Sequence, residues 1–174
     1  MTEYRFTLKY RLSSEDRDAE ALVERLGEAG CTDALVGVGI AGRLALDFTR
    51  EADSAQDAIR SALADVKEAI PTASLIEVAP DFVGLTDIAD LMGVARQSMR
   101  KQMLGHSDFP LPVHEGPVSI WHLEDVLGWL DGRKGYKPDT VVRETATVAR
   151  TINMVREARR YASNKVEEIE CFVV

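Results

Sequence analysis

The sequence contains no run of 18 or more apolar residues, so we expect no segment that spans a membrane. Cysteine is scarce, and Cys31 and Cys171 lie far apart, which suits a reducing cytoplasm better than a disulfide framework. The first residues carry neither a basic cluster nor an apolar stretch, so a secretory signal is not expected. Internal repeats and low-complexity tracts are also absent. These absences favour a globular protein of the cytoplasm.

Motifs that carry enzyme chemistry are missing as well. We find no nucleophile elbow, phosphate-binding loop or cluster of catalytic side chains, so we expect no enzymatic activity. His106, His114 and His122 are spaced eight residues apart, which matches no metal-binding motif. Residues 37–42 fit the pattern GxGxxG, but a strand pattern follows them where a dinucleotide site requires a helix. We therefore expect a hairpin turn there, no cofactor and no metal.

The net charge of −8 argues at first against a nucleic-acid partner, but the charges are unevenly distributed. Residues 133–165 carry nine basic and three acidic side chains, a net charge of +6, whereas residues 1–80 have a net charge of −6. Local charge decides contact with phosphate more than the total charge does. The basic segment therefore keeps DNA binding open.

Residues 1–80 switch between strand and helix patterns. Residues 4–12 alternate strictly between apolar and polar side chains, which is typical of a half-buried strand. We expect Ser13 or Ser14 to cap a first helix and Ser54 to cap a second. Three further strands are expected at residues 34–38, 44–48 and 75–78. The order βαββαβ predicts a ferredoxin-like α+β sandwich, a domain that would sense a ligand or, as we prefer, bind a protein partner.

The second half of the chain has mainly helical patterns after a short joint at residues 80–84. We expect a hairpin from residues 109–113 and 118–121, a helix at 123–130, a long helix at about 139–163 and a tail strand at 166–174. Apolar positions recur along the long helix and favour dimerisation, at Val141, Val142, Val148, Ile152 and Val155. Alternatively, its arginines would touch phosphate, namely Arg156, Arg159 and Arg160. The predicted domains are 1–80, 84–131 and 138–174.

Residues 85–104 have the pattern of two helices joined by a tight turn. We expect Thr86 to cap the first helix, and Gly93 permits the turn because glycine accepts a positive φ. In the second helix Met99 is expected to face the core. The outward side chains are Arg96, Gln97, Arg100 and Lys101. The pattern predicts a helix-turn-helix, whose second helix lies in the DNA major groove.

The outward side chains suit contact with DNA. Arginine can donate two hydrogen bonds to guanine, and glutamine can pair with adenine through two bonds. Ser98 and Lys101 suit phosphate oxygens, which fix the register of the protein without reading sequence. The start of this helix adds a favourable dipole for phosphate.

The helix-turn-helix, the hairpin and the helix that follows it together resemble the winged helix of the MerR, excisionase and AlpA type, over residues 84–131. The resemblance implies that the hairpin is a wing and that a helix with a tryptophan near its end, here Trp129, closes the core. It also implies the DNA-binding residues Arg96, Gln97, Arg100 and Lys101, with His114 and Glu115 at the tip of the wing.

These features predict a homodimeric, sequence-specific transcriptional regulator of bacterial or phage type that binds double-stranded DNA. A dimer would require an inverted repeat in its operator. An antitoxin-like autorepressor that also holds a second protein fits this layout by analogy of fold. Two alternatives remain open: an adaptor whose winged helix no longer binds DNA, and an architectural recombination directionality factor.

Overall fold

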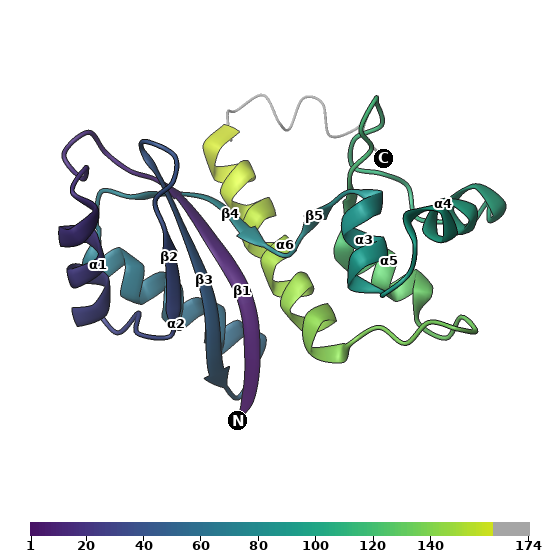
Figure 1. The fold of residues 1–174 in the computed structure, drawn as a ribbon, viewed down its shortest axis with the longest axis horizontal. Coiled ribbons are helices and arrows are strands. Elements are labelled where there is room, and N and C mark those ends of the chain that lie inside the picture. Colours follow the sequence, from purple (N-terminus) through teal and green to yellow (C-terminus); the bar gives the residue numbers. More distant parts are fainter. Residues whose placement is uncertain (162–174) are drawn as a thin grey trace.

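The computed structural model describes residues 1–161 of the 174-residue chain, so the predicted tail strand at 166–174 lies outside the described residues. The protein is an α+β structure with an antiparallel sheet in one half and mainly helices in the other (Figure 1). No helix in residues 1–161 combines the length and the hydrophobicity needed to cross a membrane. In chain order the elements are β1 (Thr2–Arg11), α1 (Ala19–Glu28), β2 (Ala34–Gly37), β3 (Arg43–Ala52), α2 (Ala55–Ala69), β4 (Ser74–Ala79), β5 (Phe82–Val83), α3 (Leu85–Leu91), α4 (Arg96–Gly105), β6 (Trp121–His122), α5 (Leu123–Leu130) and α6 (Thr140–Tyr161).

The four-stranded sheet has the order β2-β3-β1-β4, and neighbouring strands run antiparallel. The alternation predicted for β1 is confirmed, because Tyr4, Phe6, Leu8 and Tyr10 are buried and the residues between them are at least partly exposed. The buried face forms one hydrophobic cluster with side chains of α1, α2 and α6. The order βαββαβ over β1 to β4 is therefore as expected, and the expected turn between β2 and β3 is formed by residues 38–42, since Gly37 still belongs to β2.

Of the two helix caps predicted in this half, one is confirmed and one is wrong. Ser54 caps α2 as predicted, since its hydroxyl accepts a hydrogen bond from the amide of Asp57 at 3.1 Å. The prediction that Ser13 or Ser14 caps α1 is wrong, because α1 starts only after Asp18, whose carboxylate accepts two amides of the first turn. An aspartate both caps the amides and interacts with the helix dipole, so it competes well with an earlier serine.

The segment predicted as a plain joint, residues 80–84, contains a strand. β5 pairs with β6 in a short antiparallel sheet, with Phe82 opposite His122 and Val83 opposite Trp121. This pairing connects the end of the large sheet to the start of α5. The joint is therefore held by backbone hydrogen bonds and is part of the second half of the protein.

The second half packs α3, α4 and α5 around its own hydrophobic cluster. Trp121 is buried, and its indole nitrogen donates to the Pro110 carbonyl at 3.0 Å. Trp129 lies edge-on against Phe109, with ring centroids 4.8 Å apart. Both tryptophans therefore belong to the packing of this half, as the resemblance implied for Trp129.

The predicted hairpin is wrong, because residues 109–113 form no strand and, of residues 118–121, only Trp121 lies in one. Pro110 and Pro112 lack the amide hydrogens that a strand would donate to its partner. One bridge, between His114 and Ile120, closes the loop, and Trp121 pairs with β5 instead of with residues 109–113. We call residues 111–120 the wing loop.

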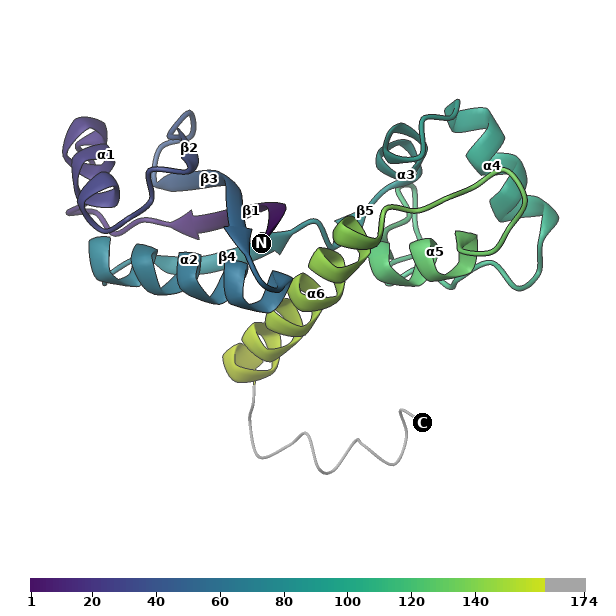
Figure 2. The same cartoon turned by 90° about the horizontal axis from the view of Figure 1, so that it is seen from below.

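Helix α6 joins the two halves, as Figure 2 shows. Ala149 is fully buried in the cluster of the large sheet, together with the partly buried Val141, Val148 and Ile152. Ala146 is fully buried in the cluster of the second half, where Val142 also packs. Most of the apolar positions that favoured dimerisation are thus used within the chain. Val155 is the exception among them, with 48% of its surface exposed.

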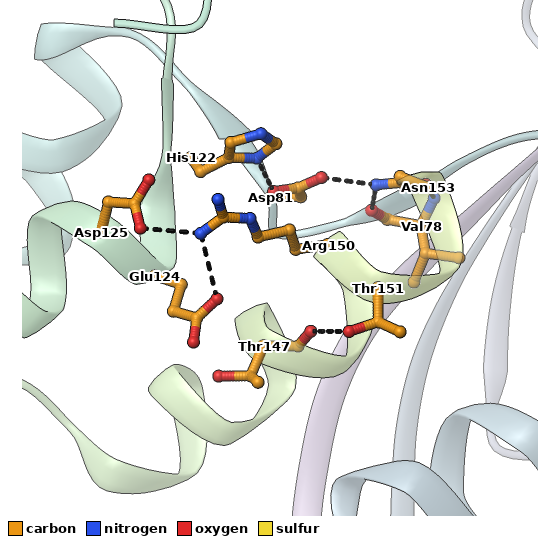
Figure 3. A network of polar contacts seen from close by, with 9 residues as sticks. All are labelled: Val78, Asp81, His122, Glu124, Asp125, Thr147, Arg150, Thr151 and Asn153. Atoms are coloured by element: carbon orange, nitrogen blue, oxygen red, sulfur yellow. Dashed lines mark hydrogen bonds and ion pairs between the residues drawn. The ribbon is translucent and has the colours of Figure 1, made fainter. Parts of the chain in front are cut away.

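A buried polar network fixes α6 to both halves (Figure 3). The side chain of Asn153 donates to the Val78 carbonyl and accepts from the Val78 amide, both at 2.8 Å. It also donates to Asp81, whose other oxygen lies 2.6 Å from Nδ1 of His122. Because Asp81 is fully buried, each of these partners offsets the cost of removing its carboxylate from water.

Candidate DNA-binding surface

The turn between α3 and α4 requires glycine at one position. Gly93 has a φ of 65°, in the left-handed region where side chains with a Cβ are strained. Next to it, the amide of Val94 donates to the carbonyl of Ala89 at 2.9 Å, which closes the turn. The N-cap of α3 is Gly84, whose amide donates to the Asp87 carboxylate, so the prediction that Thr86 caps this helix is wrong.

Helix α4 has one buried and one exposed face. Met99 is fully buried in the cluster of the second half, as predicted. The predicted DNA-contacting side chains on α4 are all exposed: Arg96, Gln97, Ser98, Arg100 and Lys101. The helix thus presents three cations and two hydrogen-bonding side chains to solvent on one short element.

The cations of α4 differ from the arginines that follow in the chain. Arg133, Arg143 and Arg150 each lie within ion-pair distance of a carboxylate. In residues 1–161 no carboxylate comes this close to the three cations of α4. Much of the basic segment at residues 133–165 therefore forms ion pairs within the fold, whereas the cations of α4 remain available to a ligand.

Arg150 illustrates this bracing role (Figure 3). Its guanidinium lies 2.7 Å from Asp125 and 3.3 Å from Glu124, both at the start of α5. Burial would lower the pKa of Arg150, but the hydrogen bonds and charges of these two carboxylates outweigh burial and raise it. Arg150 is therefore charged and links α6 to α5 through these ion pairs.

A hollow of about 480 Å³ lies beside α4. Its walls come from the start of α3, from α4 and from residues 116–119 of the wing loop. Arg96 and Arg100 both line it, together with the hydroxyl-bearing residues Thr86 and Ser119. Sequence reasoning did not assign Thr86 or Ser119 to this surface, because no spacing rule places the wing loop against α3.

The wing loop contributes little positive charge. His114 is exposed, and its ring lies so close over Gly116 that a Cβ built there would be 2.8 Å from Nε2. Glu115 is exposed, and residues 106–120 contain neither lysine nor arginine. Apolar side chains dominate the loop surface instead, with Leu111 87% and Val118 67% exposed. His114 thus lies on a loop whose surface is mainly apolar, unlike the cationic surface of α4 in the same half of the protein.

Comparisons of the chain with protein-family models, with curated proteins and with solved structures gave no match, so the candidate site rests on the residues described above.

Proposed function

We propose that this protein is a sequence-specific, double-stranded DNA-binding regulator that acts as a dimer in the cytoplasm and reads the major groove with α4. The observation that carries the proposal is the exposed face of α4, where Arg96, Arg100 and Lys101 lack a carboxylate partner among residues 1–161. Unpaired arginines on a short exposed helix are available to bases and phosphates without first breaking an ion pair. The proposed fold of residues 84–131 is a winged helix, and that of residues 1–80 is ferredoxin-like.

The start of α4 supports the proposal. Ala95 is the N-cap residue and has no side chain that could accept the first amides of the helix. The free amides and the positive end of the helix dipole would then bind a backbone phosphate. Arg96 and Gln97, in the first turn, would point toward base edges next to that phosphate.

The test is a titration of the purified protein with its own upstream DNA and with a scrambled fragment of equal length, at two salt concentrations. We expect a preference of about 10³-fold or more for the upstream fragment that persists at the higher salt concentration. Weak binding of both fragments that disappears with salt would mean phosphate attraction alone, and would contradict specific reading.

Matched variants identify the surface. Arg96→Ala with Arg100→Ala should abolish the preference, because each bidentate contact to a base contributes about 1–3 kcal/mol. The control removes two exposed positive charges from α2, Arg60→Ala with Lys67→Ala, and should bind like the parent protein. Equal loss in both variants would show that only total charge matters.

A second candidate function is that of an adaptor that binds a protein through the same half. The exposed apolar side chains of the wing loop favour it, since Leu111, Val113 and Val118 are each more than half exposed. An adaptor should keep its partner when Arg96 and Arg100 are replaced and lose it when Leu111 and Val118 become serine.

A recombination directionality factor would instead bend DNA and occupy several adjacent sites.

Within the first proposal, autorepression of antitoxin or phage-regulator type is the role we favour. The second half would bind the operator, and the sheet half would hold a protein partner. A fragment from the chain's own upstream region is therefore the first DNA to test.

A further inference from the structure

A hollow of about 630 Å³ opens at one end of the four-stranded sheet, away from the residues of the candidate DNA-binding surface. Its walls come from the connection between β1 and α1, from the start of α1 and from the turn between β2 and β3. Figure 1 shows this connection and this turn at the end of the sheet opposite the N-terminus. The amide of Leu12 donates to the Gly42 carbonyl at 2.9 Å and joins the two segments. The hollow has the size of a small-molecule site, for which about 300–1,000 Å³ is usual.

Apolar side chains form much of the wall of this hollow. Leu22 of α1 is buried, and Leu12 at the end of β1 is partly buried. On the turn between β2 and β3, Val38 is 38% exposed and Ile40 is 70% exposed. An apolar molecule in the hollow would remove these side chains from water, which is favourable in proportion to the area covered. The hollow therefore suits a ligand with an apolar body.

Two exposed arginines, Arg17 and Arg43, also line the hollow. Among residues 1–161, no carboxylate lies within ion-pair distance of either guanidinium. Arg43 lies directly opposite Arg11 of β1, and like charges in this arrangement destabilise a sheet. An anion bound beside Arg43 would offset this repulsion, so the charges at this end of the sheet favour an anionic ligand.

One carboxylate lines the hollow too, but it already has partners. Asp16 accepts hydrogen bonds from the side chains of Ser13, Thr72 and Arg25. The guanidinium of Arg25 lies 2.7 Å from this carboxylate and compensates its charge. The two unpaired arginines therefore dominate the charge that a ligand meets in the hollow.

A neighbouring hollow of about 560 Å³ shares Ile40 and Arg43 with the first. Its other cation is Lys9, which lies 3.2 Å from the carboxylate of Glu77. In the described part of the chain, the first hollow thus offers two unpaired cations and the second offers one. The first hollow is therefore the better site for an anion.

We propose that the hollow at the end of the sheet binds a small organic anion. The acidic group of the ligand contacts Arg17 and Arg43, since guanidinium groups match carboxylate and phosphate oxygens in geometry and charge. The apolar body of the ligand covers Leu22, Val38 and Ile40. An organic cation would be repelled by the two arginines, and a neutral molecule would leave both without a partner. The site goes beyond the proposed function, because it needs no DNA and leaves the other surfaces of the sheet half available to a protein partner.

Three probes with the same eight-carbon chain and different head groups test the site: octanoate, 1-octanol and octylammonium. Each is titrated into the isotope-labelled full chain without DNA, and amide NMR spectra locate the binding. We expect octanoate to shift the signals of residues 12–17 and 38–43 saturably, with a dissociation constant of about 1 mM or below. 1-Octanol should bind about tenfold more weakly, and octylammonium should not bind. An octanoate titration without saturation, shifts located elsewhere, or equal binding of octanoate and octylammonium would overturn the proposal.

Substitutions separate the role of the charges from that of the apolar wall. Arg17→Gln with Arg43→Gln should weaken octanoate binding about tenfold or more and leave 1-octanol binding unchanged. Val38→Ser with Ile40→Ser should weaken the binding of both probes. Octanoate binding that is the same in the arginine variant as in the parent would overturn the proposal. The four side chains are exposed, so both variants should melt cooperatively like the parent.

The matched control removes two exposed cations from α2, through Arg60→Gln with Lys67→Gln. This variant should bind octanoate like the parent protein. Equal weakening in the control and in the arginine variant would mean that only the total charge matters, and would also overturn the proposal. All of these outcomes leave the proposed function untouched, because they are measured without DNA. A protein that binds octanoate as expected but shows no preference for its upstream DNA would contradict the proposed function alone.

Discussion

At the scale of the residue, the side chain of Arg50 holds three parts of the first half together. Its guanidinium donates to Asp33, which precedes β2, and to Asp65 and Ser61 on α2. The hydrogen bonds that Arg50 donates to Asp33 raise the pKa of Arg50, burial lowers it, and Asp65 adds to the rise. Arg50 is only 9% exposed, and its ion pairs with Asp33 and Asp65 offset the cost of burying its charge.

Replacing Arg50 with methionine should lower the free energy of unfolding by about 3 kcal/mol, because two carboxylates then lose their buried partner. Urea denaturation followed by circular dichroism measures this change. The control is Arg60→Met, which removes an exposed arginine with a 3.5 Å ion pair and should change stability by less than about 0.5 kcal/mol. Equal effects of the two variants would contradict the bracing role of Arg50.

Asp16 gives a prediction about pH. Hydrogen bonds from Thr72, Arg25 and Ser13 lower its pKa to about 2, below the value of about 3.9 for an unfolded chain. A lowered folded-state pKa stabilises the protein above the unfolded pKa, and this contribution is lost as the pH falls from about 4 toward 2. Asp16→Asn should therefore be less stable than the parent at pH 7, and the difference should shrink as the pH approaches 2.

Thermal melts at pH 7, 4 and 3 measure that difference. A gap in melting temperature that stays constant across these values would show that the Asp16 charge does not contribute. Asp18→Asn is a suitable comparison, because it changes a carboxylate at the neighbouring helix cap that lacks ion-pair partners among the described residues.

At the scale of the element, α6 shows what the sequence could and could not predict. The pattern predicts a long helix near residues 139–163, and the structure has it at Thr140–Tyr161. The partner of its apolar positions could not be predicted, because the buried residues that decide it are small. Ala146 and Ala149 face different hydrophobic clusters, and an alanine fits a core or a surface equally well in a sequence.

The wing loop and the helix starts mark the other limits of prediction. Strands with strict alternation, the cap at Ser54 and the exposed face of α4 follow from local pattern and were predicted. The pairing of β5 with β6 joins segments almost 40 residues apart, so no local pattern indicates it. Pro110 and Pro112, by contrast, already argued in the sequence against a strand at residues 109–113.

Asn153 should be the most sensitive polar position of α6. Asn153→Ala leaves the amide and carbonyl of Val78 without partners and removes a donor from buried Asp81, so we expect a loss of about 3 kcal/mol. Thr151→Ala, two residues away, removes only a hydroxyl bonded to Thr147 on an exposed turn and should cost less than about 0.5 kcal/mol. Urea titrations of both variants measure their free energies of unfolding. Similar losses in the two variants would contradict the role of the network.

At the scale of the whole molecule, an acidic protein with a net charge of −8 is proposed to bind DNA through three cations per protomer. A dimer that uses only these cations neutralises at most about six phosphates, so the plot of log K against log salt concentration should have a slope no steeper than roughly −5. A fluorescence anisotropy titration over several salt concentrations measures it. Lys101→Ala should make the slope less negative by about two units in the dimer.

A much steeper slope would contradict that count of contacts. It would point to further phosphate contacts by the arginines near the end of α6, Arg156, Arg159 and Arg160. Replacing Arg159 and Arg160 with alanine distinguishes the two cases, because this change should leave the slope unaltered if α4 and its partner copy supply the cations.

The position of α6 in the chain has a consequence for synthesis on the ribosome. The strands β1 to β4 leave the exit tunnel long before α6 is translated, yet Ala149, Val148 and Ile152 complete their hydrophobic cluster. Part of the hydrophobic core of the nascent sheet therefore stays exposed until α6 has been made. In the same way, the cluster of the second half stays incomplete until Ala146 has been made. A product of premature termination before Thr140 would lack α6, which completes both hydrophobic cores, so proteases would degrade it readily. Only a chain translated through α6 would hold α4 on a complete core, as the proposed contact with DNA requires.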